Sequence, residues 1–466
     1  MSSKDPTRSR SQRKGGEDKV TKNEEPEELN SKNSPKEGET VMSSVEQEQK
    51  RITRREFVKG AAVGAVAGVV VGGGGTALLM PEKGGKVIEL PGEWDKEADV
   101  VVAGYGAAGS AAAIEAHDAG AKVLILEKMP LPGGSIGRCG GAILGAGSSI
   151  QKALGIEDSA EKLYEWLMVS TTGMTPPDIA RAYSENTGKN VDWLMKLGED
   201  FGVGAPVPTQ EGSMGVGGVD FLGAAYEHFG VEAVPRSHWA TAKEAKFGEH
   251  AGPELFTPLY AAINAKNIEA LFETGLVELL SNGKEVVGVR AESKGKSLYI
   301  KARKGVVVAT GGFAYNDEMK RIYNPEMLGV NSYMTPAATG EGILAAQALG
   351  ASFANMSLYY PHRGPHYVHS DPDAPYFDWG DEPGVVGSDT DPVMAETHGG
   401  VVINTQAQVM DVFGKVIPRL YASGCAVGSN VFGKPGNYPG CGCYVSFAIC
   451  FGRIGGKNAA AEEPWS

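Results

Sequence analysis

The pattern of hydrophobic and polar residues predicts a strand, a helix and a second strand that follow one another from residue 98. Residues 98–103 (ADVVVA) form a nearly continuous apolar run, which is typical of a buried strand in a parallel sheet. Residues 104–119 combine a glycine-rich turn with small residues that predict a closely packed helix, and residues 122–126 (KVLIL) predict the second strand. This order is the first unit of a doubly wound α/β fold.

The same reading predicts further elements toward the C-terminal end. Residues 285–292 alternate between apolar and polar positions, as a half-exposed strand does, and residues 306–309 predict another buried strand. Residues 399–404 and 416–422 predict two more strands, and residues 443–461 predict a long helix. We therefore expect the α/β pattern to continue to the end of this part of the chain.

The first 96 residues have a different pattern. Residues 1–50 carry few large apolar side chains, which predicts a disordered N-terminal extension. Arg54, Arg55, Phe57 and Lys59 precede a weakly hydrophobic run at 60–80 that holds seven glycines. This run is a poor membrane span, and with the arginines it resembles a twin-arginine export signal at 51–80, followed by a linker at 81–96. We expect a twin-arginine translocase as partner and a periplasmic or extracytoplasmic location. Permanent anchoring by an uncleaved signal is the alternative, because no clear Ala-x-Ala site follows.

Composition narrows the function classes. The chain has 466 residues, 42% of them hydrophobic, which is enough for a large core, and its formal net charge of −13 argues against a nucleic-acid partner. The spacing of Cys441, Cys443 and Cys450 fits no zinc or iron–sulfur pattern, so we expect buried or disulfide-paired thiols. The histidines at 362, 366 and 369 predict a solvated polar loop rather than a metal site.

Segment 104–109 (GYGAAG) has the spacing of a dinucleotide-binding turn, and it follows a strand and opens a helix. Gly104 permits the tight turn, Gly106 lets the backbone approach a pyrophosphate, and Gly109 lets the helix pack on the strand. The helix N-terminus supplies oriented N–H groups to the phosphates. Glu127 ends the next strand, where its carboxylate can accept hydrogen bonds from the adenosine ribose.

Five later segments carry a family resemblance: 132–135 (PGGS), 309–313 (ATGGF), 397–401 (THGGV), 417–424 (IPRLYASG) and 451–456 (FGRIGG). They resemble motifs of the fumarate reductase and succinate dehydrogenase flavoprotein superfamily, and they frame residues 97–461. The resemblance implies FAD as cofactor and a Rossmann-like FAD-binding domain at 97–312 and 397–461. A small inserted substrate (capping) domain is expected at 313–396. The cofactor-binding residues expected are Gly104, Gly106, Ala107, Ala108, Gly109, Glu127, Lys128, Gly133, Gly134, Ser135, Ala309, Thr310, Gly311, Gly424, Cys425, Cys443 and Tyr444.

Two features of this resemblance concern the flavin itself. Cys425 stands where the superfamily often has an acid, so a contact to the ribityl chain is lost or replaced. The superfamily also places the N-terminus of its last helix against the flavin ring, which here implies residues 440–444. The partial positive charge of that helix end would stabilise the anionic reduced flavin.

The substrate motifs favour one branch of the superfamily. The arginine by which fumarate-type enzymes bind a carboxylate falls at Pro439 or Gly440, and their histidine before T-x-G-G is Glu396. Segments 430–433 (NVFG) and 437–442 (NYPGCG) instead resemble 3-ketosteroid dehydrogenases. That resemblance implies that the Tyr438 hydroxyl and the Gly442 N–H bind the substrate ketone and stabilise enolate character.

The catalytic base is less well defined by the sequence. Tyr359 and Tyr360 precede a proline, as an aromatic pair does in the ketosteroid enzymes, so both are expected to line the substrate pocket and either could be the base. Tyr315 and Tyr323 lie nearer the domain junction. His238 follows Arg236 in an R-x-H pattern that fumarate-type enzymes also carry, which makes it a further candidate.

These features together predict an exported FAD-dependent oxidoreductase that acts on a CH–CH bond next to a carbonyl. The expected substrate is a small hydrophobic, steroid-like carbonyl compound or an unsaturated acid. No c-type haem attachment motif is present, so the hypothesis includes a separate electron carrier, a quinone or a cytochrome. Two alternatives remain: a fumarate reductase-like respiratory reductase, and a non-catalytic flavin-binding subunit, which the short segment 313–396 favours.

Overall fold

The computed structural model describes residues 90–201, 219–220, 229–241, 252–330, 332, 334–363, 366–367, 385–386, 392–433 and 439–465. The predicted extension at 1–50, the predicted signal at 51–80 and most of the predicted linker at 81–96 lie outside these residues and stay predictions. Within the described ranges, no helix is long and apolar enough to cross a membrane.

A central sheet carries the described part of the chain. Its strand order is β16-β17-β9-β1-β2-β6, and β1 (Lys96–Ala103) pairs in parallel with β2 (Val123–Leu126) and with β9 (Lys296–Val308). The other strands are β6 (Glu269–Leu271), β16 (Gln408–Met410), β17 (Val416–Ala422) and the antiparallel extension β7 (Thr274–Ser281) and β8 (Val286–Ser293). The pairings of β9 with β1 and β17, and of β2 with β6, join strands that are distant in sequence, as in a doubly wound fold.

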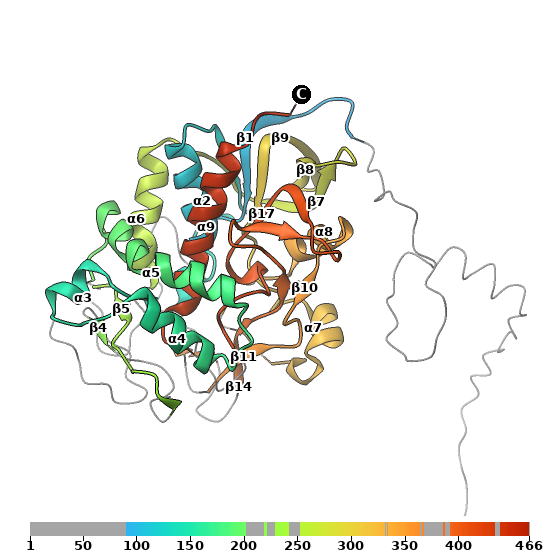
Figure 1. Cartoon of the computed structure of the whole chain (residues 1–466). Helices are drawn as coiled ribbons and strands as arrows, with labels where there is room; N and C mark the ends of the chain where they lie inside the picture. Colours follow the sequence, from blue (N-terminus) through green and yellow to red (C-terminus); the bar gives the residue numbers. More distant parts are fainter. Residues whose placement is uncertain are drawn as a thin grey trace, which may run out of the picture. The chain divides into compact units, whose positions relative to one another are not determined.

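Two helices lie side by side over this sheet (Figure 1): α2 (Ala107–Asp118) and α9 (Cys443–Ala461). Glycines of α9 make this close approach of the two helices possible. A Cβ atom added at Gly452 would lie 2.5 Å from the Ala108 carbonyl oxygen, and one added at Gly456 would lie 2.1 Å from the Ala112 oxygen. The FGRIGG segment is therefore the surface by which the last helix packs on the helix of the dinucleotide turn.

A smaller layer stands beside these helices and positions the start of α9. It contains a three-stranded sheet in the order β3-β5-β4, made of β3 (Ala142–Leu144), β5 (Ser237–Trp239) and β4 (Val219–Asp220). Its helices are η1 (Ile136–Arg138), α3 (Ser149–Ala153), α4 (Ala160–Ser170), α5 (Pro177–Leu197) and α6 (Gly252–Ala265). The Leu144 N–H donates to the Gly442 carbonyl at 3.3 Å, and the Ser446 hydroxyl donates to the Leu144 carbonyl at 2.6 Å. The small sheet thus holds the loop that leads into α9.

The region predicted as a capping domain is described in part. Its helices are α7 (Asp317–Tyr323), η3 (Pro325–Met327) and α8 (Glu341–Ala348). Its strands are β10 (Phe353–Ala354), β11 (Tyr359–Arg363), β12 (His366–Tyr367), β13 (Val385–Val386) and β14 (Pro392–Thr397), and β11 pairs with β14 in antiparallel fashion. The side chains of the histidines at 362, 366 and 369 lie outside the described part, so the polar loop expected there is untested. The domain boundaries also stay predictions.

The predicted elements differ from the structure at two places. Residues 399–404 were expected to form a strand, but only β15 (Gly400–Val401) does so. The chain turns at Asn404, whose side-chain oxygen accepts from the N–H groups of Gln406 and Gln408. The expected strand at 306–309 is the end of the much longer β9, whose first half mixes lysines with apolar residues. The last helix, by contrast, begins and ends where the sequence predicts.

Candidate cofactor and active site

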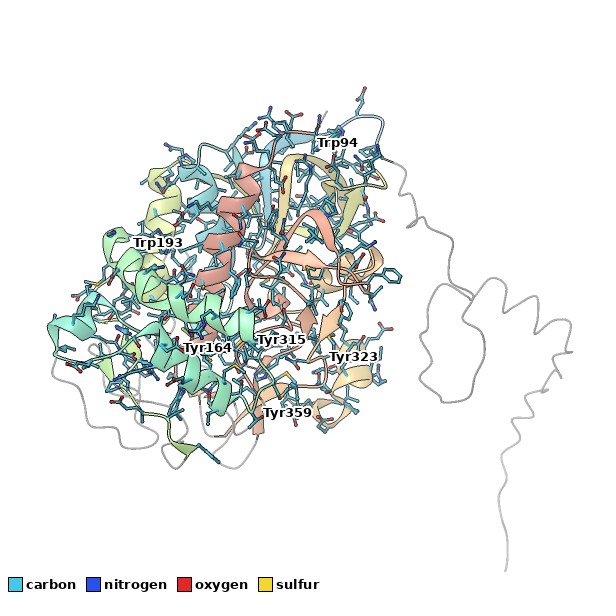
Figure 2. The ribbon with its side chains drawn as sticks, in the orientation of Figure 1. Trp94, Tyr164, Trp193, Tyr315, Tyr323 and Tyr359 are labelled. Carbon is cyan, nitrogen blue, oxygen red and sulfur yellow. The ribbon has the colours of Figure 1, made fainter. Side chains whose placement is uncertain are left out.

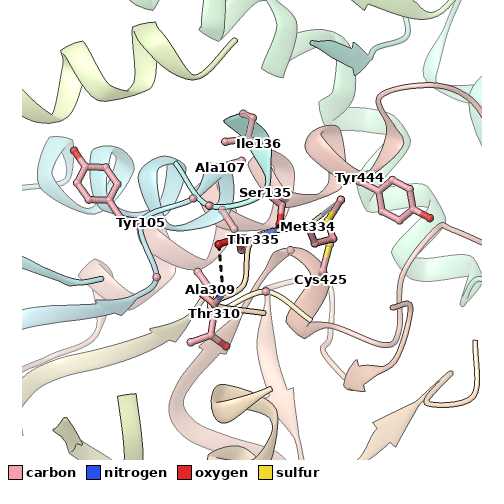
Figure 3. Close-up of a pocket in the computed structure, with 18 of the residues that line it drawn as sticks. Tyr105, Ala107, Ser135, Ile136, Ala309, Thr310, Met334, Thr335, Cys425 and Tyr444 are labelled. Carbon is pink, nitrogen blue, oxygen red and sulfur yellow. Dashed lines mark hydrogen bonds between the residues drawn. The ribbon is translucent and has the colours of Figure 1, made fainter. Parts of the chain in front are cut away.

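A deep pocket follows the carboxyl ends of the parallel strands, where α/β sheets bind their ligands. Figure 3 shows Tyr105 and Tyr444 on opposite sides of this pocket, with Ser135, Thr310 and Cys425 between them. Most of the predicted cofactor residues line it: Gly104, Gly106, Ala107, Ala108, Glu127, Lys128, Gly134, Ser135, Ala309, Thr310, Gly311, Gly424, Cys425 and Tyr444. Gly109, Gly133 and Cys443 are not among the lining residues. The structure therefore brings together segments that the sequence spreads over more than 300 residues.

The dinucleotide turn has the geometry that its glycines require. Gly104 has a φ of +108°, and a Cβ added there would lie 2.2 Å from the Ala309 carbonyl oxygen. A Cβ at Gly109 would lie 1.9 Å from the Gly104 carbonyl oxygen, which explains why this glycine supports the turn without lining the pocket. Gly106 precedes α2 directly and leaves the N-terminal N–H groups of that helix open to a phosphate.

Glu127 is buried at the end of β2, at the same end of the pocket as the turn. One of its carboxylate oxygens accepts from the Tyr105 N–H at 2.9 Å and the other accepts from the Met129 N–H at 2.8 Å. Burial raises the pKa of Glu127, and these two backbone hydrogen bonds oppose that shift. Its remaining lone pairs can accept from ribose hydroxyls. Lys128 beside it donates to the Thr339 hydroxyl at 2.6 Å and pairs with Glu341.

The middle of the pocket fits the extended part of FAD. Gly134 has a φ of +53° and Gly424 a φ of +71°, so two backbone turns without Cβ atoms belong to the lining. The Thr310 hydroxyl lies in this stretch, and it is buried without a hydrogen-bond partner among the described residues. This hydroxyl lies against α8, where a Cβ added at Gly342 would lie 2.4 Å from it, so the fit to FAD rests on the backbone of the two turns and on the dinucleotide turn. The residues present therefore fit FAD.

The N-terminus of α9 forms the far end of the pocket. Gly442 caps this helix with a φ of +84°, and a Cβ added there would lie 2.6 Å from the Ile143 Cα. The preceding loop is held by Trp166, which donates to the Pro439 carbonyl at 2.6 Å, and by the Ser237 hydroxyl, which donates to the Cys441 carbonyl at 3.1 Å. Within the described residues the Gly442 N–H has no acceptor of its own. Tyr438, its predicted companion donor, lies outside the described residues.

The structure separates the two predicted tyrosines of β11. Tyr360 lines the pocket and its ring stands edge-on to the Tyr444 ring, with centroids 6.4 Å apart. Tyr359 is not among the lining residues, because adjacent strand residues point to opposite faces. Figure 2 shows Tyr359 with Tyr315 and Tyr323 on the side of the molecule that carries α7. Of these two tyrosines, only Tyr360 lines the pocket and stays a candidate for a role there.

His238 is placed away from the pocket. Its Nδ1 lies 2.9 Å from the Arg236 carbonyl oxygen and its Nε2 lies 2.7 Å from the Ser148 hydroxyl, so both ring nitrogens are engaged. Burial lowers the pKa of His238 to about 4, which keeps the ring neutral. Arg236 forms a buried two-pronged ion pair with Asp158 at 2.8 Å. These contacts explain the R-x-H segment as packing, so the expected catalytic role of His238 finds no support in its position.

Tyr444 has a partner that the sequence did not indicate. Its hydroxyl lies 2.6 Å from Nε2 of His398, and Nδ1 of His398 lies 3.0 Å from the Gly433 carbonyl oxygen. A carbonyl only accepts, so Nδ1 carries the proton and the Tyr444 hydroxyl donates to Nε2. Burial lowers the pKa of His398 to about 4. The Tyr444 hydroxyl is therefore directed to His398, while its ring lines the pocket.

Glu396 is a pocket residue that sequence reasoning did not include in the site. It is 4% exposed, it lines the pocket beside Cys425, and its Oε1 accepts from the Thr397 N–H at 3.0 Å. Burial raises its pKa to about 7, and a hydrogen bond from the Cys425 thiol opposes that shift. The only signal in the sequence is that Glu396 stands where fumarate-type enzymes carry a histidine.

The cysteines and the acidic residues form no metal site in the described part of the chain, where no group of three His, Cys, Asp or Glu residues could hold an ion. All five cysteines are free thiols, and Cys443 and Cys450 are buried. The expectation of buried thiols is therefore right for these two, and the structure contains no disulfide between the five.

Comparison with known proteins also indicates an FAD-binding protein. The family model described as FAD binding domain matches residues 99–372. The NADH:fumarate oxidoreductase of Klebsiella pneumoniae is 33% identical over 267 residues, which cover 57% of this chain and 26% of that protein. The fumarate reductase (cytochrome) of Shewanella frigidimarina is 31% identical over 287 residues, which cover 61% of this chain and 46% of that protein. The chain thus spans less than half the length of these curated relatives.

A solved structure resembles the fold over most of the chain. It is the 3-ketosteroid-Δ4-(5α)-dehydrogenase from Rhodococcus jostii in complex with 4-androstene-3,17-dione, with a TM-score of 0.66 at 25% identity. The match covers 80% of this chain and 98% of that chain. It confirms the predicted fold class, an α/β Rossmann-like FAD-binding fold.

Proposed function

Because this chain belongs to the FAD binding domain family, with FAD as its cofactor, we propose that it is an oxidoreductase acting on a carbon–carbon bond next to a carbonyl. One observation carries the proposal. A single pocket joins the dinucleotide turn at 104–109 to the N-terminus of α9, where Gly442 offers its N–H. Bound FAD supplies hydride transfer there.

The residues at the α9 end supply the remaining chemistry. The backbone of Gly442 packs closely against Ile143, and its carbonyl accepts from the Leu144 N–H, so its own N–H is a preorganised donor for a carbonyl oxygen. Such a donor stabilises the enolate character that develops when the neighbouring C–H bond loses its proton. The N-terminus of α9 adds partial positive charge at the same place. Tyr360 lies in the lining, where its hydroxyl is the described candidate for proton transfer.

The charge of the pocket favours an uncharged carbonyl substrate. Among the described lining residues Lys128 is the only lysine or arginine, and it is paired with Glu341. Glu396 adds an acid to the same lining, which also disfavours a carboxylate ligand. The similarity to a dehydrogenase solved with 4-androstene-3,17-dione supports a steroid-like ketone. The similarity to two fumarate reductases supports the alternative, a reductase of an unsaturated acid or enone served by a quinone or cytochrome.

Two assays on the FAD-loaded protein separate these functions. The first supplies a 3-ketosteroid with an artificial electron acceptor, and the second supplies fumarate with a reduced viologen under anaerobic conditions. We expect turnover in the first assay alone. Turnover of fumarate alone would replace the proposal by its alternative. FAD binding without turnover in either assay would instead support a non-catalytic flavin-binding subunit.

We also propose export through the twin-arginine pathway, on the basis of Arg54, Arg55 and the glycine-rich run that follows. Cell fractionation of the full chain tests this. The double variant with Arg54→Lys and Arg55→Lys should stay in the cytoplasm. The control variant with Arg8→Lys and Arg10→Lys should still be exported, because those two arginines lie outside the predicted signal. Export of both variants to the same extent would contradict the proposal.

A further inference from the structure

Glu396 is a buried carboxyl group that the proposed reaction does not use. It lies near the end of β14, between two turns that line the pocket, those at Gly311–Gly312 and at Gly424–Cys425. A Cβ added at Gly312 would lie 2.7 Å from its Oε1, and the Cys425 thiol donates to its carboxylate. No lysine or arginine in the described part of the chain forms an ion pair with Glu396. A buried carboxylate without a cation needs further hydrogen-bond donors.

The place of Glu396 along the pocket shows which part of a bound FAD it would meet. Gly424 lies against the start of α2, since a Cβ added there would lie 3.2 Å from the Ala108 Cβ. The Gly424–Cys425 turn is therefore next to the diphosphate end of the pocket, and Tyr360, paired with Glu396 across β11 and β14, faces the α9 end. Figure 3 shows Cys425 between Thr310 and Tyr444. Glu396 thus stands between the phosphate turn and the helix that would face the flavin ring.

The segment of FAD that spans this distance is the ribityl chain, whose hydroxyl groups are hydrogen-bond donors. We propose that Glu396 is a cofactor-binding residue whose carboxylate accepts hydrogen bonds from the ribityl hydroxyls of FAD, with the Cys425 thiol holding it in place. The proposal rests on FAD binding at this pocket. Cys425 itself is too short and too weak an acceptor for this task. The thiol donates to Glu396 instead.

The titration of this cluster gives the proposal a pH dependence. The titratable groups that face Glu396 are Cys425 on η4 (Gly424–Ala426) and Tyr360 on β11, and burial raises the pKa of both from values that already lie above neutral. Only Glu396 in this cluster titrates near pH 7. An ionised carboxylate is the stronger acceptor. FAD affinity should therefore increase as the pH rises from 6 to 8, in proportion to ionised Glu396.

The test measures the FAD dissociation constant of the apoprotein by flavin fluorescence, at pH 6 and pH 8. Glu396→Gln keeps the shape and removes the charge, so affinity at pH 8 should fall about tenfold or more. The matched control is Glu199→Gln, another buried carboxyl with a raised pKa that does not line the pocket, and its FAD affinity should equal that of wild type. Apoprotein melting temperatures show whether either change affects folding.

A double variant makes the test specific. Cys425→Glu in the Glu396→Gln background returns a carboxylate to the neighbouring position, and it should restore most of the lost FAD affinity. Wild-type FAD affinity in Glu396→Gln, or a loss that the double variant leaves uncorrected, would overturn the proposal. A change in the binding of a ketosteroid to the holoenzyme without a change in FAD affinity would also overturn it. Wild-type protein that binds no FAD would instead refute the proposed function.

Discussion

At the scale of single residues, the site depends on positions where one backbone passes against another. Gly442 is one of these, because its φ of +84° is costly for an L side chain and Ile143 fills the space where a Cβ would lie. The N–H of such a residue is aimed by the surrounding backbone rather than by a flexible side chain. This is the property that an oxyanion-binding donor needs.

We predict that Gly442→Ala destabilises the protein by more than about 2 kcal/mol, because backbone strain and overlap with Ile143 add together. Gly414→Ala is the matched control: its φ is +73°, but nothing lies within 4 Å of an added Cβ, so it should lose only about 1 kcal/mol. Urea denaturation of both variants provides the measurement. Equal losses would show that close packing against Ile143 contributes nothing.

At the scale of elements, the pairing of α2 with α9 links the two ends of the pocket. The N-terminus of α2 belongs to the dinucleotide turn and that of α9 to the opposite end of the pocket, so any change in the distance between these helices moves one half of the pocket against the other. Gly452 and Gly456 set this distance by direct contact with the backbone of α2.

Gly456→Ala should therefore cost roughly 2 kcal/mol of stability, because its Cβ would overlap the Ala112 carbonyl and the gain in helix propensity offsets only part of that overlap. Gly455→Ala, one residue earlier, would meet the Ala407 Cβ at 3.3 Å and the Tyr421 Cβ at 3.6 Å but no backbone atom, and should be close to neutral. Thermal unfolding of the two variants compares them. A stable Gly456→Ala protein would contradict the helix contact described here.

At the scale of the whole molecule, the local parts of the site could be predicted and the long-range parts could not. The turn at 104–109 is legible because strand, glycines and helix are contiguous in sequence, and the last helix was predicted with its bounds. The contact of Glu396 with Cys425 and that of His398 with Tyr444 join separate strands, turns and helices, which periodicity cannot pair. The R-x-H pattern at His238 does not by itself indicate catalysis, because the same residues also suit a buried ion pair next to a neutral histidine.

Buried ionisable groups also make the stability of the whole molecule depend on pH. Glu199 is buried near Asp200 and Glu254, and burial together with these charges raises its pKa from 4.5 to about 8. The folded state therefore holds a proton that the unfolded state releases above pH 4.5, and the stabilisation is lost as the pH rises toward 8. Burial raises the pKa of Glu396 only to about 7. Burial lowers the pKa values of His238 and His398 to about 4, so these two histidines change the free energy of unfolding only below pH 6.5. The window from pH 7 to pH 8 thus reports mainly on Glu199.

We predict that the free energy of unfolding of the apoprotein falls by about 1 kcal/mol between pH 7 and pH 8, because a carboxyl group with a pKa of about 8 holds on average about 0.7 proton over that interval in the folded state and almost none in the unfolded state. Glu199→Gln cannot release this proton, so its unfolding free energy should be nearly constant over the same interval. Wild type and Glu199→Gln should be closest in stability near pH 5. At that pH the Glu199 carboxyl of the folded wild-type protein is protonated, and it resembles the amide that replaces it in the variant. Parallel pH profiles for wild type and variant, measured by urea denaturation, would show that Glu199 is already ionised at neutral pH. Its burial would then need a cationic partner, which the described residues do not provide as an ion pair.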